Sequence, residues 1–430
     1  MKRFFIQNFG CRAAQADGAA LDSLLAAKGL ESSPDAASAD LVVLNTCTVT
    51  AEADSDVRSS IRRVHRTNPE AKILVTGCYA QRSPKDLKAI PGVTWVVGNS
   101  HKTQIGEIVD LNAPYHSQVF VSDILSSAEF LSSPIEDAFG DRTRPNLKIQ
   151  DGCNNLCTFC IIPSVRGRSR SMPADRVLEQ VRSLARVYRE VVLTGVNLGR
   201  WGREPQMRLR LADLLRRILN ETSVELLRLS SVEPMDFSDD LLELMAASPR
   251  IAKHVHAPLQ SGSDTVLKRM KRRYRVRHYE DRIRKAYQLM PQAAFGADVM
   301  TGFPGETDQE FAETYSFIER LPFTYLHVFT YSERPGTPAI ELPQVAVPVR
   351  KDRTRLLREL AARKNAAFRA SLVGQRLKAV TLTNGEALTE NYVRVELATA
   401  REPNQLITVT PAALTETGLR EASVFNVLAS

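Results

Sequence analysis

Three cysteines near the middle of the chain have a spacing that suits iron chemistry. Cys153, Cys157 and Cys160 follow the pattern C-x3-C-x2-C, directly after a short apolar stretch, Leu147–Gln150, that predicts a strand. Three thiolates in one loop can bind three irons of a cubic iron–sulfur cluster, and the fourth iron is then open to a substrate. The alternative is a structural zinc site. Such sites usually have four ligands, and no nearby His or fourth Cys completes one in this sequence.

The other three cysteines, Cys11, Cys47 and Cys78, lie far apart in the sequence but share one local setting. Each follows an apolar stretch that predicts a strand, and helical stretches come between them. Strands that alternate with helices predict a parallel, doubly wound sheet, whose functional edge lies at the carboxyl ends of the strands. We therefore expect the three thiols to converge. The alternative is three buried structural cysteines, because free Cys packs well as a small apolar residue.

Length and composition predict a globular protein of two or three domains, with 430 residues of which 43% are hydrophobic. The excess of 57 Lys and Arg over 49 Asp and Glu gives a net charge of +8, which is compatible with a polyanionic partner but does not demand one. No apolar stretch approaches the length of a membrane span, and the amino-terminal stretch predicts a first strand, not a signal peptide. We expect a cytoplasmic protein, no membrane association and reduced, metal-binding thiols.

The middle of the chain contains six strand–helix units, which predict an open, partial (β/α)6 barrel with its active face at the carboxyl ends of the strands. Polar, glycine-rich turns follow four of these strands and could approach a bound ligand closely. The predicted strands are Leu147–Gln150, Val191–Thr194, Glu225–Leu229, His254–Leu259, Ala294–Met300 and Tyr325–Thr330.

The last sixty or so residues change to a period of two, which predicts short strands and a small β-barrel. Asn384-Gly385 is a typical hairpin turn between two of them. We therefore expect an α/β protein with four segments. They are an amino-terminal domain over 1–130, a linker over 131–143, a barrel over 144–370 and a β domain over 371–430.

Two basic stretches could contact a polyanion or could be solvated surface. The first contains Arg166, Arg168 and Arg170, directly after the cysteine loop. A phosphate backbone would have to pass this place to reach an open cluster, so we predict that these three arginines bind RNA. The second covers 268–278, between two predicted helices, and solvated surface is as good an interpretation there.

The stretch Gly152–Ser171, around the cysteine loop, resembles the radical S-adenosylmethionine (SAM) methylthiotransferases, and especially their threonylcarbamoyladenosine tRNA branch. The loops at Cys11, Cys47 and Cys78 are similar to those of the family's amino-terminal domain. One position departs from the family, which usually has Asn three residues after its first cysteine, where this chain has Ala14. The carboxyl-terminal segment, with Thr389–Val395, resembles the TRAM domain, an RNA-binding module.

The resemblance implies two 4Fe–4S clusters and SAM as cofactors. The first cluster would bind at Cys153, Cys157 and Cys160, and an auxiliary cluster at Cys11, Cys47 and Cys78. The residues expected to bind SAM lie in the cysteine loop and the strand-end turns: Phe159, Gly195, Asn197, Ser231, Glu233 and Gln260.

The resemblance also implies a reaction, in which a radical derived from SAM activates an adenine C–H that no base could deprotonate. Sulfur would come through the auxiliary cluster, and a second SAM would supply the methyl group. The expected substrate is N6-threonylcarbamoyladenosine at position 37 of tRNA, in the anticodon stem-loop. Expected partners are an electron donor such as flavodoxin or ferredoxin, and a sulfur donor. Alternatives are methylthiolation of isopentenyladenosine in tRNA, methylthiolation of a ribosomal-protein aspartate, or a two-cluster RNA-binding or electron-transfer protein without catalytic activity.

Overall fold

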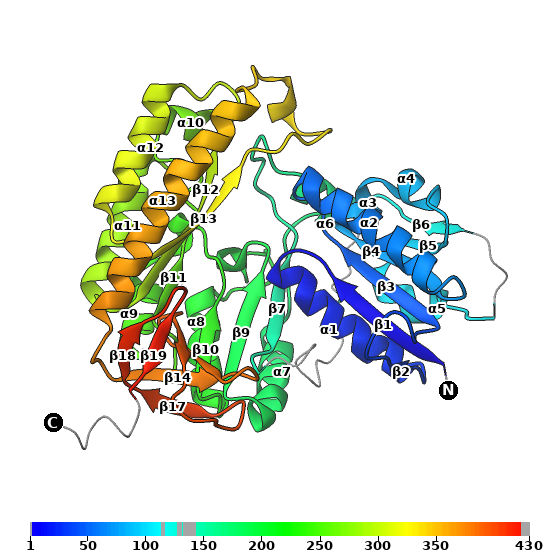
Figure 1. Cartoon of the computed structure of the whole chain (residues 1–430), viewed down its shortest axis with the longest axis horizontal. Coiled ribbons are helices and arrows are strands. Elements are labelled where there is room, and N and C mark those ends of the chain that lie inside the picture. Colours follow the sequence, from blue (N-terminus) through cyan, green and yellow to red (C-terminus); the bar gives the residue numbers. More distant parts are fainter. Residues whose placement is uncertain (1, 113–116, 127–130, 132–142, 423–430) are drawn as a thin grey trace.

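The structure is a computed structural model that describes residues 2–112, 117–126, 131 and 143–422. Most of the linker predicted over 131–143 therefore lies outside the described residues. Along the chain, the described residues form a parallel sheet with its helices, then a partial barrel, and then a curled sheet beneath the barrel (Figure 1). Helix α1 lies at the boundary between the first sheet and the barrel, where it packs against β7.

The amino-terminal sheet is parallel throughout and has the order β2-β1-β3-β4-β5-β6 in the described part of the chain. Val42 packs with Val57 of α2 on one face, whereas Val43 packs with Leu21 of α1 on the other. Because helices cover both faces, the predicted doubly wound arrangement is confirmed. The strands are β1 (Arg3–Asn8), β2 (Glu31–Ser32), β3 (Leu41–Thr46), β4 (Lys72–Gly77), β5 (Val93–Gly98) and β6 (Gln118–Phe120). The helices are α1 (Arg12–Ala27), α2 (Ala51–Thr67), α3 (Cys78–Arg82), α4 (Pro84–Lys88) and α5 (Ile105–Ile108).

The barrel is open and contains the six predicted parallel strands, counted over the described residues. The first three strands pair in one sheet with the short strand β8, the last three pair in a second sheet, and a parallel bridge between Leu227 and Ile251 joins the two. Strand β11 ends at His256, earlier than predicted, because Pro258 has no N–H to donate to a neighbouring strand. The strands are β7 (Asn146–Asp151), β8 (Arg170–Ser171), β9 (Glu190–Gly195), β10 (Leu226–Leu229), β11 (His254–His256), β12 (Ala294–Thr301) and β13 (Tyr325–Thr330).

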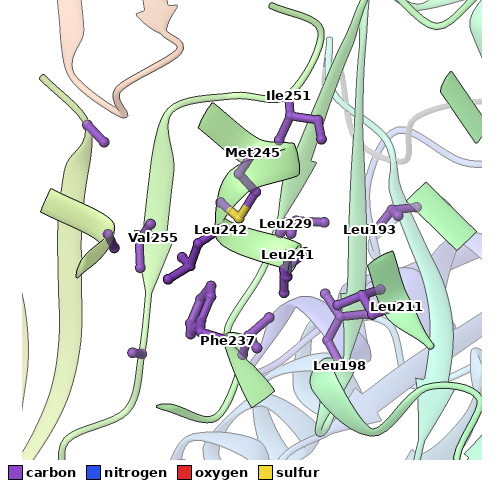
Figure 2. Packing of buried hydrophobic residues seen from close by; sticks show 14 of the residues in the cluster. Leu193, Leu198, Leu211, Leu229, Phe237, Leu241, Leu242, Met245, Ile251 and Val255 are labelled. Atoms are coloured by element: carbon purple, nitrogen blue, oxygen red, sulfur yellow. The ribbon is translucent and has the colours of Figure 1, made fainter. Parts of the chain in front are cut away.

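Helices cover the outside of the barrel and form one continuous apolar core with its strands. Leu241 and Met245 of α9 pack toward Leu229 of β10 and Val255 of β11 (Figure 2). Helix α9 begins where the Ser238 hydroxyl accepts a hydrogen bond from the Leu241 N–H at 3.2 Å. Among the described residues, every helix is too short or too polar to span a membrane. The helices are α6 (Ile162–Arg166), α7 (Ala174–Val187), α8 (Leu211–Glu221), α9 (Asp239–Ala247), α10 (Asp264–Arg269), α11 (Val276–Leu289), α12 (Asp308–Arg320) and α13 (Val347–Ser371).

The carboxyl-terminal sheet curls into a half-barrel that lies beneath the barrel (Figure 1), where Val380 packs with Leu226, the first residue of β10. The predicted hairpin is present, with the Leu382 N–H donating to the Glu386 carbonyl at 2.7 Å and Gly385 at a φ of +76°. Arg228 of the barrel donates to the Thr389 carbonyl at 3.1 Å and so attaches the sheet. The strands are β14 (Leu377–Thr381), β15 (Glu386–Thr389), β16 (Arg394–Glu396), β17 (Leu406–Val409), β18 (Pro411–Leu414) and β19 (Leu419–Glu421).

Candidate iron–sulfur centres and their surroundings

The loop with the C-x3-C-x2-C pattern begins where β7 ends, at the carboxyl edge of the barrel. Gly152 precedes Cys153 and has a φ of +72°, and a Cβ atom there would lie 2.0 Å from the Arg168 carbonyl oxygen. Only glycine allows this close approach. The Cys160 N–H donates to the Cys157 carbonyl at 3.1 Å, which folds the second half of the loop into a turn. The backbone thus holds the three cysteines on one short, tightly folded loop.

Hydrogen-bond donors point at the sulfur atoms of this loop. The sulfur of Cys153 accepts from the Asn155 N–H at 3.4 Å and from the Asn197 side chain at 3.7 Å. The sulfur of Cys157 accepts from the Arg272 guanidinium at 3.2 Å. Such donors stabilise thiolates and are the outer contacts that cluster-ligating cysteines use. The donor set therefore fits an iron–sulfur cluster.

Arg272 is a site residue that sequence reasoning missed. Its side chain is only 6% exposed, and it forms an ion pair with Glu233, one of the residues expected to bind SAM. The same guanidinium contacts Cys157, so it positions the Glu233 carboxylate beside the cysteine loop. The only signal in the sequence was the position of Arg272 in the basic stretch 268–278, which could equally have been solvated surface.

Two other predicted SAM ligands lie next to the cysteine loop. The backbone N–H of Asn197 donates to the side-chain oxygen of Gln150 at 2.6 Å. The side-chain amide of Asn197 donates to the sulfur of Cys153. The Asn197 side-chain oxygen is buried and has no hydrogen-bond partner among the described residues, so it is free to accept from a ligand. Gly195 lies at the end of β9, where a Cβ atom would be 2.9 Å from the Gln150 side-chain oxygen.

The remaining predicted SAM ligands lie at the other strand ends. Gln260 follows β11 with a φ of +65°, a left-handed conformation that is uncommon for a residue with a side chain and that often marks a functional site. Phe159 packs edge to face on Phe303, with 6.4 Å between ring centroids. The Ser231 hydroxyl is hydrogen-bonded to His256 Nδ1 at 2.7 Å, and SAM contact stays a prediction for it.

A polar cluster lies on adjacent strands of the barrel. Asp298 of β12 lies 3.3 Å from His256 of β11 and 3.1 Å from His327 of β13. Burial alone would raise the pKa of Asp298, but the two neighbouring imidazoles lower it well below its usual range. The three ligand atoms are close enough to hold a metal ion. The hydrogen bond between His327 and Asp298 and the charge of the carboxylate beside two imidazoles explain the geometry equally well, so the cluster does not by itself indicate a metal.

The auxiliary cysteines converge at the carboxyl edge of the amino-terminal sheet. Cys47 follows β3 and Cys78 follows β4, while Cys11 lies in the loop after β1, and these three strands are neighbours. Gly10 has a φ of +94°, and a Cβ atom there would lie 2.8 Å from the Cys47 sulfur, so only glycine fits. Burial and the neighbouring Cys78 raise the pKa of Cys47 to about 12. An iron ion bound to this sulfur would offset that effect, because it stabilises the thiolate form.

A buried ionic network joins the two cysteine sites. Asp17 of α1 is 1% exposed and accepts from Lys102 at 3.1 Å, from Arg166 at 3.0 Å and from Lys148. Lys148 also donates to Asp151 at 2.7 Å, two residues before Cys153. Burial alone would raise the pKa of Asp17, but the three cations outweigh it and hold that pKa far below its usual range.

Arg166 belongs to this network and not to an RNA-binding surface, which corrects the prediction made from the basic stretch. Its side chain is 2% exposed, donates to Asp151 at 3.0 Å and reaches the sulfur of Cys78 at 3.3 Å. No surface is left for a phosphate. Arg168 is exposed and Arg170 is half-buried, so RNA contact stays a prediction for these two. Arg166 instead connects an auxiliary cysteine with the end of β7.

We expect Asp17→Asn to lower the free energy of unfolding by about 3–5 kcal/mol, because it removes the carboxylate that pairs with buried Lys102 and leaves Lys148 and Arg166 with Asp151 alone. A carboxylate whose pKa is lowered by folding stabilises the folded state above about pH 4, and this stabilisation is lost as the pH falls further. The difference from wild type should therefore shrink below about pH 4. Denaturant unfolding at several pH values measures this difference in the free energy of unfolding. The fully exposed Asp35→Asn is the control, and equal stability of the two variants would contradict a stabilising network.

Comparison with known protein families agrees with this architecture. Residues 147–318 match the family described as the radical SAM superfamily. Residues 3–98 match the family described as uncharacterized protein family UPF0004. The first match contains the C-x3-C-x2-C loop, and the second contains all three auxiliary cysteines. In solved structures, the radical SAM methyltransferase TsrM from Kitasatospora setae shares the fold, with a TM-score of 0.58, 16% identity, and coverage of 79% of this chain and 75% of that one.

Curated relatives match over most of the chain. Threonylcarbamoyladenosine tRNA methylthiotransferase MtaB of Aquifex aeolicus is 36% identical and covers 94% of this chain and 98% of its own. The Bacillus subtilis protein of the same name is 42% identical, over 81% of this chain and 78% of its own. A tRNA-2-methylthio-N(6)-dimethylallyladenosine synthase of Desulforamulus reducens is 32% identical, over 84% of this chain and 80% of its own. This chain belongs to the radical SAM methylthiotransferase family, together with the threonylcarbamoyladenosine tRNA enzymes.

Proposed function

We propose that this protein converts N6-threonylcarbamoyladenosine at position 37 of tRNA to its 2-methylthio derivative. The near full-length similarity to curated threonylcarbamoyladenosine enzymes supports this activity most strongly. Enzymes of this family use SAM and two 4Fe–4S clusters. The two sets of three cysteines and the donors directed at their sulfurs support the same cofactors.

Cys153, Cys157 and Cys160 would hold the cluster with the open iron. A reduced 4Fe–4S cluster supplies the electron that splits SAM and so makes a carbon radical able to take hydrogen from an adenine C–H. The chain's own part is to bind and align SAM. The Glu233 carboxylate, fixed by Arg272, and the unpartnered oxygen of Asn197 can accept hydrogen bonds from the amino group and the ribose hydroxyls.

Cys11, Cys47 and Cys78 would hold the auxiliary cluster, through which sulfur reaches the substrate. Arg166 and Asn99 donate to the Cys78 sulfur at 3.3 and 3.7 Å, which stabilises negative charge there. The Cys47 sulfur accepts a hydrogen bond from the backbone N–H of Val49 at 3.5 Å. Ala14 cannot supply the side-chain hydrogen bond of the family's usual Asn. Its carbonyl instead accepts from Asn45 at 2.7 Å, which joins α1 to the end of β3.

The partners of this activity follow from its chemistry. Electrons have to come from a low-potential donor such as flavodoxin or ferredoxin, and a sulfur donor has to restore the sulfur that leaves with each product. We propose a cytoplasmic location, where tRNA is modified. We also propose that the predicted division into a cluster domain, a barrel and a TRAM-like RNA-binding domain describes the roles of the three parts.

We expect Arg168→Ala to weaken tRNA binding and to reduce the slope of log affinity against log salt concentration by about one unit. The reason is that one phosphate contact is lost. Reductive SAM cleavage without tRNA should be little changed. Filter binding over a salt series measures the slope. Arg176→Ala, which removes an exposed arginine paired with Glu179, is the matched control. An unchanged slope in Arg168→Ala would place the RNA path elsewhere.

The substrate test compares three anticodon stem-loop RNAs with the cluster-loaded enzyme, SAM and a reductant. The RNAs carry threonylcarbamoyladenosine, isopentenyladenosine or adenosine at position 37, and mass spectrometry of the nucleosides measures the products. We expect methylthio product from the first RNA alone. The similarity to dimethylallyladenosine synthases supports isopentenyladenosine as a second candidate, and product from that RNA alone would establish it. Reduction that releases no 5′-deoxyadenosine would indicate a protein without catalytic activity.

A further inference from the structure

We propose that a cavity of about 460 Å³ binds an anionic group of the substrate RNA, either a phosphate or the carboxylate of the threonylcarbamoyl group. This inference rests on the proposed function. We name the site the arginine cavity, because Arg12, Arg144 and Arg394 contribute to its wall. It lies where the three parts of the fold meet. Arg12 begins α1, Arg144 precedes β7, and Arg394 begins β16 of the carboxyl-terminal sheet.

The charges around the arginine cavity are unbalanced. Arg144 lies 3.4 Å from Glu190, whose carboxylate already accepts from Arg228 at 2.6 Å. Arg12 donates to the phenol oxygen of Tyr392 at 2.8 Å, which carries no charge. Arg394 pairs with Glu386 at 2.8 Å. Among the described residues, the four guanidiniums of Arg12, Arg144, Arg228 and Arg394 thus share two carboxylates, those of Glu190 and Glu386. An excess of positive charge is left at the wall of the cavity, where an anion would balance it.

Two pKa shifts reflect this excess. Burial and the neighbouring Arg228 and Arg12 lower the pKa of Arg144, despite the opposing effect of Glu190. Burial alone would raise the pKa of Tyr392, but the surrounding guanidiniums outweigh it and lower that pKa. A bound anion would relieve both shifts, because it would compensate the same positive charges.

The cavity wall is held rigid by Tyr392. This residue has a φ of +64°, a strained conformation for an aromatic residue, so the surrounding structure must enforce it. Its ring stacks on His254 at 4.5 Å between centroids, and the guanidiniums of Arg12 and Arg228 lie 5.6 and 5.5 Å from its centre. Tyr325 packs on it as well, at 5.5 Å. The position of Arg12 is therefore fixed before any ligand arrives, which reduces the entropy lost on binding.

The chemistry of the wall selects oxygen anions. Planar guanidiniums bind phosphate and carboxylate groups through paired hydrogen bonds, and the amides of Asn146 and Asn384 lie in the same wall. The substrate RNA offers both anions, on its backbone and on its threonylcarbamoyl group. Arg12 directly follows Cys11, so the cavity begins one residue from an auxiliary-cluster cysteine.

The test uses the Arg144→Gln/Arg394→Gln double variant as cluster-loaded protein. Arg12 is kept because it adjoins Cys11, and Glu190 keeps its Arg228 partner in the variant. The matched control is Arg420→Gln. It removes an exposed ion pair, with Glu396 at 2.9 Å, in the same sheet as the Arg394–Glu386 pair at 2.8 Å. Iron content and circular dichroism confirm that the clusters and the fold are intact. Anticodon stem-loop RNAs with threonylcarbamoyladenosine or adenosine at position 37 are the probes, and affinity is measured over a salt series.

A phosphate ligand predicts that the double variant binds both RNAs about tenfold or more weakly, with a salt slope reduced by about one to two units. A carboxylate ligand predicts that the variant loses the preference for the modified RNA and binds the unmodified RNA as wild type does. Affinities and slopes equal to those of wild type for both RNAs would overturn the proposal. A wild-type protein that binds neither RNA would instead contradict tRNA as the substrate, so the two failures are distinguishable.

Discussion

Replacing Cys153, Cys157 and Cys160 together by alanine is expected to leave about four irons per chain and to abolish reductive SAM cleavage. The expected residual iron is that of one 4Fe–4S cluster, because the auxiliary cysteines lie on a different sheet with its own core. Without the open iron, SAM has no site at which an electron can reach it. We expect 5′-deoxyadenosine formation to fall to the background of a reaction without enzyme.

The reciprocal variant is the control for this result. Replacing Cys11, Cys47 and Cys78 by alanine should also leave about four irons per chain, but SAM cleavage should continue. Iron analysis and chromatography of the reaction products measure both quantities. If the first variant lost all its iron, the two clusters would not be independent. If it still released 5′-deoxyadenosine, the assignment of the C-x3-C-x2-C loop would be wrong.

The Cys47→Ala variant is expected to cleave SAM reductively while it makes no methylthiolated nucleoside. Cys47 lies directly after β3 and is distant in sequence from the loop that would bind SAM. In our proposal, its loss removes one of the three ligands of the auxiliary cluster, through which sulfur would be transferred. It removes none of the three proposed ligands of the first cluster. Liquid chromatography with mass spectrometry measures 5′-deoxyadenosine and product nucleoside in the same reaction.

Val42→Ala is the matched control, because it shortens a buried side chain on β3, the strand that precedes Cys47, but removes no thiol. It should retain both SAM cleavage and product formation, apart from a loss of stability from the small cavity. If Cys47→Ala stopped SAM cleavage while the first cluster stayed intact, the division of labour between the clusters would be contradicted. Methylthio product from Cys47→Ala would show that this thiol is dispensable for sulfur transfer.

The strands and the convergence of the cysteines could be predicted because local sequence determines them. Apolar, β-branched stretches bounded by Gly and Pro gave the six barrel strands and the strands before Cys47 and Cys78. Once strands are parallel neighbours, their carboxyl ends lie at one edge, so residues far apart in sequence come together. The prediction needed no knowledge of side-chain contacts.

The roles of the charged residues could not be predicted, because they depend on distant partners. Arg166 and Arg168 lie in one basic stretch, yet the first is buried and the second exposed. The difference comes from Asp17, which is 149 residues away in sequence and draws Arg166 into the ionic network. Likewise, nothing local to Tyr392 indicates that it bonds to Arg12, 380 residues away. Local charge patterns cannot distinguish these cases.

Mass spectrometry of tRNA nucleosides from a strain that lacks this protein tests the central claim most directly. The strain should lose 2-methylthio-N6-threonylcarbamoyladenosine and accumulate N6-threonylcarbamoyladenosine, while methylthiolated isopentenyladenosine stays at its normal level. Wild-type protein supplied in trans should restore the missing nucleoside, and the Cys47→Ala variant should not. Unchanged 2-methylthio-N6-threonylcarbamoyladenosine in the deletion strain, or loss of the isopentenyladenosine derivative in its place, would contradict the account.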